Sequence, residues 1–418
     1  MLEFVTKSDG SVEPFSSEKL NKWASITAEE DVSWSELAIT AYKKLNNYCT
    51  SKDLHDAMIM ACMDIGTEAS LRVAGKLLVS NLYKEAFGGF EKLPHLSHFV
   101  SDVWVGMDYS DEEIEELNSV LDHSKDMSYN YTSLRQMKDK YLLKDVTTGQ
   151  IYESPQYMFM GISMAAMETR NKDVRLQDVI KTYEYLSDMK INLPTPMLNN
   201  LRTDLKGYAS CCVFNVGDTV ESIDVGNSIS FLMTARSAGI GGYIGTRSRG
   251  DGVKEGRIKH TGKIPLYRSI ESAVHAMLQN GSRGGAATLY YSVLDPELED
   301  LIQLKNPMTI VEKQVRGIDY GLIYNTSFAK AVANNEKWLL VSQAVAPDLY
   351  EALFSEDISK FELLLEKYWD KGVRVKARDI AMKFLTQSVE TGRKYLFNVE
   401  EVNRHTPFKD PIYSSNLC

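Results

Sequence analysis

Residues 209–242, ASCCVFNVGDTVESIDVGNSISFLMTARSAGIGG, join a short apolar run to a helical stretch and a glycine-rich segment. The apolar run is Cys211–Val216, and the helical pattern covers Ile223–Ser237. Further apolar runs at Tyr320–Tyr324 and Lys394–Asn398, with a helical stretch at Pro265–Leu278, continue the alternation. Alternating short strands and helices predict an α/β fold of βα units around a largely parallel sheet or barrel.

The residues that precede this region predict a different, mostly helical structure. Alternation over residues 2–15, with the turn signal Asp9-Gly10, predicts a hairpin, and Ser16 is placed to begin a helix. Helices are expected from Asp53 onward and over Leu71–Phe87, and from Leu93 to Met189 the pattern is mostly helical. The first ninety residues are therefore expected to form a compact unit, followed by a helical layer.

Composition limits the class of protein. The 418 residues are 44% hydrophobic and carry a net charge of −10, which excludes a disordered chain and argues against a nucleic-acid-coating protein. Five cysteines are too few for a secreted disulfide framework, and no apolar run approaches a membrane span. The composition favours a reducing, cytoplasmic location without a membrane or nucleic-acid partner.

Basic residues near the N-terminus form the first candidate site. Helix starts and ammonium groups both favour anions, so this region suits a triphosphate, although lysines scattered over a solvated surface are the alternative. The candidate residues are Lys7, Glu13, Lys19, His55 and Lys84.

Two glycine-rich segments are further candidates. Asn280–Thr288 surrounds Arg283 with glycines that allow close approach to a ligand, and a structural turn is the alternative. Ala238–Gly242 and the basic residues after it predict a mobile loop that could close over phosphates, or a flexible solvated loop. The segment Asn280–Thr288 matches neither a Walker nor a dinucleotide-binding pattern.

Cysteines provide the fourth candidate. Adjacent Cys211 and Cys212 on a predicted strand, and Cys418 at the end of Ser415–Cys418, could be redox or radical groups, or buried structural thiols. The sequence has no CxxC, HExxH or GxSxG motif, so no metal site is expected.

In this order the motifs resemble the large, catalytic subunit of aerobic, class I ribonucleotide reductase. The resemblance is carried by Val5–Ser11, Asp145–Ser154, Leu193–Pro196, Ala209–Cys212, Gly217-Asp218, Ala238–Gly241, His260–Gly262, Arg283–Thr288 and Ser415–Cys418. It implies an ATP-cone allosteric domain at 1–92, a helical domain at 93–205, and at 206–418 the first half of a ten-stranded α/β barrel that ends at the radical-cysteine finger loop.

The resemblance also implies catalytic roles. Cys418 would carry the thiyl radical that abstracts hydrogen from the ribose 3′ carbon, so that the 2′ hydroxyl leaves as water. Cys211 would belong to the redox pair, although its neighbour Cys212 leaves that assignment open. Asn416 would hold the ribose hydroxyls near Cys418. Further substrate contacts would come from Thr195, Ser210 and Arg283, with Thr195 on the diphosphate.

Allosteric roles follow in the same way. Asp218, Thr219, Val220, Arg247 and Lys254 would form the specificity site for deoxynucleoside triphosphates, with Arg247 or Arg249 as the phosphate contact. Arg283 lies on the loop that would relay effector identity to the substrate base. The five N-terminal candidates, Lys7, Glu13, Lys19, His55 and Lys84, would bind ATP or dATP and set overall activity.

The family's motifs that follow Cys418 are not in this sequence: a general-base glutamate, a second redox cysteine, relay tyrosines and a phosphate loop. We therefore expect a split large subunit whose complementary C-terminal chain completes one active site for nucleoside diphosphates. A small β subunit would supply the radical from a di-iron tyrosyl centre, and thioredoxin or glutaredoxin would be the reductant. No covalently bound cofactor is expected. The alternative is a catalytically inactive, nucleotide-sensing regulatory fragment.

Overall fold

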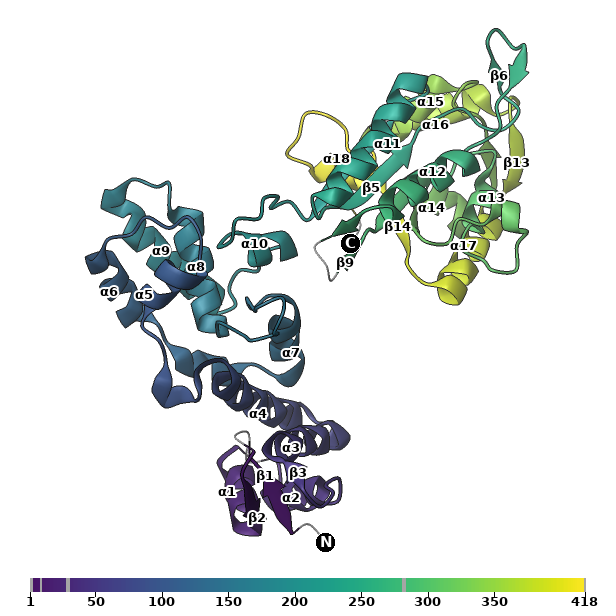
Figure 1. The fold of residues 1–418 in the computed structure, drawn as a ribbon. Helices are drawn as coiled ribbons and strands as arrows, with labels where there is room; N and C mark the ends of the chain where they lie inside the picture. The colour runs from purple at the N-terminus through teal and green to yellow at the C-terminus, as the bar shows by residue number, and fades with distance from the viewer. Residues whose placement is uncertain (1–2, 8–9, 28–30, 280–282, 417–418) are drawn as a thin grey trace. The chain divides into compact units, whose positions relative to one another are not determined.

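The computed structural model describes residues 3–7, 10–27, 31–279 and 283–416, which form two compact units (Figure 1). The helical unit spans residues 1–208 and the sheet unit spans 209–418. In the part of the chain that the structure describes, no helix is long and apolar enough to cross a membrane.

The helical unit opens with a three-stranded sheet. Its strands are β1 (Phe4–Thr6), β2 (Val12–Pro14) and β3 (Cys49–Thr50) in the order β2-β1-β3, so the predicted hairpin is confirmed. The strand β3, parallel to β1, was not predicted. Its helices are α1 (Ser17–Thr27), α2 (Trp34–Tyr42), α3 (Ser51–Ile65), α4 (Glu68–Phe87), η1 (Phe90–Lys92), α5 (Leu96–His98), η2 (Phe99–Val103), α6 (Asp111–Val120), η3 (His123–Ser128), α7 (Tyr131–Lys140), α8 (Pro155–Met167), α9 (Lys172–Ser187) and α10 (Thr195–Asn200).

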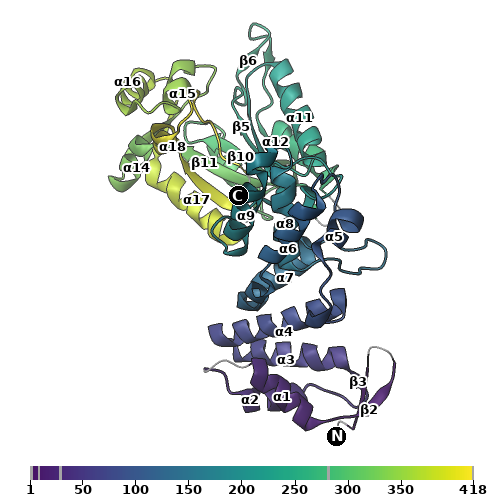
Figure 2. The same ribbon diagram turned by 90° about the vertical axis from the view of Figure 1, so that its left-hand side faces the viewer.

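Local signals explain where these helices begin and end. Thr50 forms a capping box at the start of α3, and Ser110 forms one at the start of α6. Gly66 and Gly88 end α3 and α4 in the left-handed conformation that glycine adopts without steric cost. The helices α3 and α4 consequently lie side by side (Figure 2).

One hydrophobic core runs through the helical unit from Leu20 to Leu198. The methionine-rich helix α8 is buried along most of its length, and Met158, Met160 and Met164 belong to this core. Because residues on both sides of position 92 belong to this core, the cone and helical-domain boundaries at 92/93 and 205/206 stay predictions.

A buried polar network joins four helices of this unit. The carboxyl group of Asp126 on η3 accepts hydrogen bonds from the Tyr83 hydroxyl at 2.6 Å and from Gln156 Nε2 at 2.7 Å. Tyr183 donates to Gln156 Oε1 at 2.8 Å. Burial raises the pKa of Asp126 to about 7, against the lowering effect of these hydrogen bonds.

The raised pKa of Asp126 predicts a pH dependence of stability. Its folded-state pKa lies above the unfolded value, so its contribution to stability is present at low pH and is lost as pH rises toward 7. Between pH 5 and 8, we expect wild type to lose about 2–3 kcal/mol of unfolding free energy relative to Asp126→Asn. Urea unfolding at both pH values measures the difference. Asp139→Asn, which removes an exposed carboxylate, should follow wild type, and equal slopes for Asp126→Asn and wild type would contradict the prediction.

The sheet unit contains five parallel strands: β4 (Cys211–Val216), β5 (Gly239–Ile244), β10 (Ala287–Ser292), β11 (Asp319–Tyr324) and β14 (Lys394–Asn398). Shorter strands are β6 (Gly252–Val253), β7 (Ile258–Lys259), β8 (Leu278–Gln279), β9 (Arg283–Gly284), β12 (Lys337–Leu340) and β13 (Val373–Lys376). The helices are α11 (Val220–Ala235), α12 (Ile264–His275), α13 (Leu298–Ile302), η4 (Val311–Lys313), α14 (Thr326–Ala333), α15 (Pro347–Leu353), α16 (Ile358–Tyr368), α17 (Ala377–Thr391) and α18 (Val399–His405).

The five strands lie in the order β14-β11-β10-β5-β4, so every strand neighbours the next of the five along the chain. Figure 2 labels the three central strands, β11, β10 and β5. The predicted parallel βα architecture is confirmed. Helices α11 and α12 cover one face, where Gly226 of α11 meets Val216 and Tyr267 of α12 donates to the carbonyl of Tyr290 at 3.1 Å. Side chains alternate along a strand, so the opposite face is left for other contacts.

The prediction of a mobile loop at Ala238–Gly242 was wrong. All six residues of β5 are buried, and the strand lies between β4 and β10. Its glycines allow close contact on both faces: a Cβ at Gly242 would lie 2.8 Å from the Phe214 ring, and one at Gly241 would lie 2.2 Å from the Ser415 carbonyl oxygen. The loop begins after Ile244 and carries the hairpin of β6 and β7.

Candidate functional site

The sheet unit has a cavity of about 800 Å³ on the face opposite α11 and α12. Strand β4 contributes Cys211, Val213 and Asn215 to its wall, and the segment after α18 contributes residues 408–416, including Asn416. Two of the residues predicted for catalysis, Cys211 and Asn416, therefore line the same cavity.

Strand alternation separates the two adjacent cysteines. Cys211 lies on the cavity wall, whereas Cys212 is packed against the hydrophobic core. Burial raises the pKa of the Cys212 thiol, and the neighbouring Cys211 adds to the effect. Both are free thiols. The geometry favours Cys211 over Cys212 as the thiol that faces a bound molecule.

The segment that carries Asn416 lies directly on the sheet. The backbone of Ser415 and Asn416 packs directly against Gly241, where a side chain would have no room. The Tyr290 hydroxyl donates a hydrogen bond to the Asn416 carbonyl oxygen at 3.5 Å. The Tyr413 ring packs on Phe354 with 4.7 Å between centroids. Glycine at position 241 is thus required by close approach of a second backbone.

The other predicted catalytic and substrate residues have different positions. Ser210 directly precedes β4, and its carbonyl oxygen accepts a hydrogen bond from Gly239 at 2.7 Å. Thr195 is in the helical unit, at the start of α10, with its hydroxyl 3.4 Å from that of Tyr141. Arg283 is in β9, and Cys418 lies outside the described residues.

A second site lies at the carboxyl ends of β4 and β5. Asp218 follows β4 and Arg247 follows β5, and the Arg247 guanidinium binds the Asp218 carboxylate at 2.7–2.8 Å. Thr219 caps α11 and Val220 begins it, 77% exposed, so four of the predicted specificity residues gather here. Lys254 is on the turn between β6 and β7.

Arg249 pairs with acidic residues outside this group. Its guanidinium lies 3.1 Å from Asp300 and 3.4 Å from Glu297. Of the two arginines left open as the phosphate contact, Arg247 is therefore the one beside Asp218. Asp251 and His260 in the same loop were not assigned to this site from the sequence, although His260 was part of the motif His260–Gly262. Their short distance in sequence from the basic residues of this loop could have identified them. Burial lowers the pKa of His260, and the charges of Asp218 and Arg247 act on it in opposite directions.

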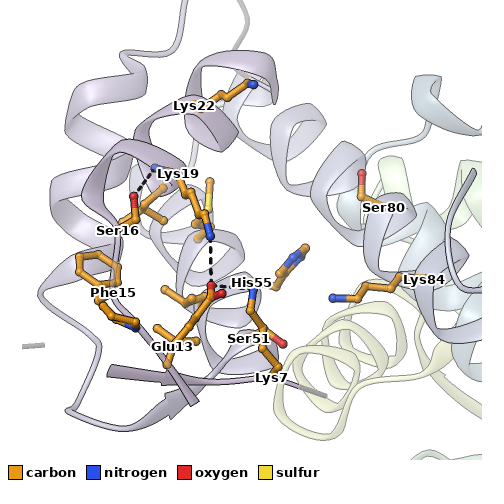
Figure 3. A pocket seen from close by; sticks show the side chains of 15 residues that line it. Lys7, Glu13, Phe15, Ser16, Lys19, Lys22, Ser51, His55, Ser80 and Lys84 are labelled. Carbon is orange, nitrogen blue, oxygen red and sulfur yellow. Dashed lines mark hydrogen bonds and ion pairs between the residues drawn. The ribbon is translucent and has the colours of Figure 1, made fainter. Parts of the chain in front are cut away.

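A third site is a cavity of about 290 Å³ in the helical unit (Figure 3). All five residues predicted from the N-terminal region line it: Lys7, Glu13, Lys19, His55 and Lys84. Lys7 directly follows β1, and the other four lie on β2, α1, α3 and α4, so the fold gathers residues that are distant in sequence. Ser16 accepts a hydrogen bond from the Lys19 amide at 3.2 Å, as expected for the residue that starts α1.

Charge in this cavity is mostly positive. Glu13 Oε1 lies 2.8 Å from Lys7 Nζ and 3.2 Å from Lys19 Nζ, and these lysines lower the pKa of Glu13. Burial, and next the charge of Lys84, lowers the pKa of His55 to about 4, so its imidazole is neutral at pH 7. Four lysines against one glutamate favour an anion.

Lys22, Ser51 and Ser80 also line the cavity and were not predicted. Phe15 and Ser16, from the predicted stretch Glu13–Lys19, line it as well. Lys22 follows Lys19 by three residues, which places both on one helix face and could have identified it. Ser51 and Ser80 carried no recognisable signal. Across the described ranges, no group of three or more His, Cys, Asp or Glu side chains could hold a metal ion.

A helical unit followed by parallel βα units, with a thiol and an asparagine in one cavity, defines a two-unit α/β-barrel-like protein. Comparison with known families matches residues 209–418 to the barrel domain of ribonucleotide reductase and residues 127–206 to its all-alpha domain. The chain therefore belongs to the ribonucleotide reductase large-subunit family.

Named relatives agree with this assignment. The chain is 33% identical to ribonucleoside-diphosphate reductase 1 subunit alpha of Escherichia coli and 35% identical to the subunit alpha of Enterobacteria phage T4. It is 27% identical to the subunit alpha of Helicobacter pylori. Each alignment covers 99% of this chain, but 57%, 57% and 54% of the respective relative. The chain thus spans little more than half the length of these relatives.

Proposed function

We propose that the chain provides the effector-binding region and half of the active site of a ribonucleoside-diphosphate reductase. The observation that carries this proposal is the common cavity of Cys211 and Asn416 on the parallel sheet. Asn416 would hydrogen-bond the ribose hydroxyls, and small displacements of such a positioning group cost much rate. Thr195 would contact the diphosphate, with Ser210 and Arg283 as further substrate contacts.

The chemistry would be radical reduction of the ribose. A thiyl radical on Cys418 would take the 3′ hydrogen, after which the 2′ hydroxyl leaves as water. Cys211 would donate one of the two reducing equivalents, and a second cysteine would donate the other to form a disulfide. Thioredoxin or glutaredoxin would then reduce this disulfide. A small subunit with a di-iron tyrosyl centre would supply the radical.

The open sheet supports a complementary half. Strands β4 and β14 are the two edges, and β14 pairs with β11 on one side. Leu396 on β14 and Val389 on α17 are 55% and 88% exposed. Edge strands with apolar neighbours need a cover. We propose that a complementary C-terminal part adds the remaining strands of a ten-stranded barrel.

The cone and specificity sites would make the reductase allosteric. The 290 Å³ cavity would bind ATP or dATP, with the lysines on the phosphates. Asp218, Thr219, Val220, Arg247 and Lys254 would sense deoxynucleoside triphosphates, with Arg283 as a relay. The ion pair of Arg247 with Asp218 would open when the guanidinium turns to a phosphate.

Removal of the cone lysines should weaken nucleotide binding. We expect Lys7→Ala or Lys19→Ala to raise the Kd for dATP about tenfold, because each loses one charge-assisted contact with a phosphate. Calorimetric titration measures the Kd. Lys43→Ala is the matched control, since Lys43 is exposed and does not line the cavity. An unchanged Kd in both cavity variants would contradict the site.

The experiment that tests the function is reconstitution. The chain is combined with the complementary C-terminal part of the large subunit, the small subunit, thioredoxin and its reductase, and deoxyribonucleoside diphosphate formation is measured. We expect turnover that Asn416→Ala and Cys211→Ser abolish. Binding of dATP without turnover in the complete mixture would overturn the catalytic proposal and support a nucleotide-sensing fragment.

A further inference from the structure

The segment that leads to Asn416 is exposed where it first lines the cavity wall, after helix α18. Helix α18 ends at His405, since Thr406 precedes Pro407 and a residue before proline disfavours the helical conformation. Residues 407–411 are all exposed, and Phe408 is 70% exposed. The position of Asn416 therefore depends on where the segment is next held against the rest of the sheet unit.

That point is Ile412. The side-chain amide of Asn403 on α18 donates to the Ile412 carbonyl oxygen at 3.0 Å and accepts a hydrogen bond from the Ile412 amide at 2.7 Å. An asparagine amide has a donor and an acceptor side by side, so it can pair with both backbone groups of one residue as a neighbouring strand would. Both bonds fix the segment in register.

From Ile412 the path to Asn416 is short. Four residues span at most about 14 Å, so a shift at Ile412 is passed on to Asn416 with little chain to absorb it. Tyr413 is held next, with its ring packed on Phe354 and parallel to the Tyr243 ring at 6.5 Å. Ser415 then meets the backbone of Gly241. The Asn403 side chain does not line the cavity, unlike residues 408–416.

We propose that Asn403 is a positioning residue for the reaction, because its amide pins Ile412 and so places Asn416 in the cavity. The proposal rests on the proposed reductase function, since it assigns Asn403 a role at that active site. Asn403 makes no contact with substrate in this role. Its effect is transmitted through the backbone of residues 412–416.

Amide exchange tests the anchor without reference to activity. In the full chain we expect Asn403→Ala to speed hydrogen exchange at the Ile412 amide at least tenfold. Asn403→Asp should keep that amide protected, because a carboxylate still accepts its hydrogen bond. His405→Ala, at the exposed end of the same helix, should exchange as wild type. Wild-type exchange at Ile412 in Asn403→Ala would overturn the anchor.

Kinetics of the reconstituted reductase test the consequence. We expect Asn403→Ala to lower kcat about ten- to one-hundredfold with KM within twofold of wild type, and Asn403→Asp to fall between the two. An unchanged kcat in Asn403→Ala would overturn the positioning role. If the wild-type mixture shows no turnover, the proposed function fails and the positioning role with it, while the exchange result still decides whether Asn403 anchors Ile412.

Discussion

Gly241→Ala is expected to lower the activity of the reconstituted reductase at least one-hundredfold. A Cβ at this position would lie 2.2 Å from the Ser415 carbonyl oxygen and 2.7 Å from Asn416 Cα. Both neighbours are backbone atoms, and β5 is held between two other strands, so neither side can yield cheaply. The segment with Asn416 must move away from the sheet, and an error of about 1 Å can cost one-hundredfold in rate.

Substrate turnover and amide exchange of residues 412–416 measure the effect of Gly241→Ala together. Exchange should accelerate in this segment while the strands keep their protection. Gly284→Ala controls for the loss of a glycine from the same unit, because a Cβ there meets nothing within 4 Å and should leave the unfolding midpoint unchanged. Full activity in Gly241→Ala would show that the segment does not lie on β5 during turnover.

Arg202→Met is expected to destabilise the helical unit by about 3–5 kcal/mol. Arg202 and Glu153 form an ion pair in which both side chains are fully buried. Removal of one partner leaves an uncompensated charge in the interior, which is the costly way to break such a pair. Arg202 also donates to the carbonyl oxygens of Tyr141 and Leu198, and these bonds would be lost as well.

Urea unfolding of the chain measures the loss in Arg202→Met. Arg170→Met provides a matched control, because its pair with Asp178 is 58% and 32% exposed and should contribute less than about 1 kcal/mol. The double variant Arg202→Met/Glu153→Gln should recover part of the loss, since no buried charge remains. Equal destabilisation by both single variants would contradict the argument.

Because Tyr141 lies next to Thr195, the buried pair would also affect the substrate contact that we propose for Thr195. Arg202 donates to the Tyr141 backbone, and the Tyr141 hydroxyl is 3.4 Å from that of Thr195. We therefore expect that an Arg202 variant that is destabilised less and still folds binds the diphosphate of a substrate less tightly than wild type does.

Local patterns were sufficient for much of the fold. The apolar runs at Cys211–Val216 and Lys394–Asn398 coincide with β4 and β14, because their apolar residues are dense and bounded by turn residues. Strand β5 was missed because three of its first four residues are glycines, which lower strand propensity. Those glycines serve contacts with Phe214 and Ser415 that no local pattern contains.

The sites show the same division. The five cone residues were named from the sequence and line one cavity, while their role in binding stays a prediction. The sequence left open which of Cys211 and Cys212 is the redox residue, and the structure places Cys211 on the cavity wall. Asn403 could not be found, because a single asparagine on a helix has no motif, and its partner Ile412 is identified by tertiary structure.

The strand order has a consequence for how the sheet unit folds. Each strand pairs with the next one in the chain, so β4, β5, β10, β11 and β14 can be added one after another as they leave the ribosome. The contact of Ser415 with Gly241 is different, because it joins a residue near the C-terminal end of the unit to the second strand of the sheet, and most of the unit's sequence lies between them. Contacts of such long sequence separation form late. We expect the sheet to be complete before Asn416 reaches its place, so that slow-folding molecules accumulate with a formed sheet and an incomplete cavity wall.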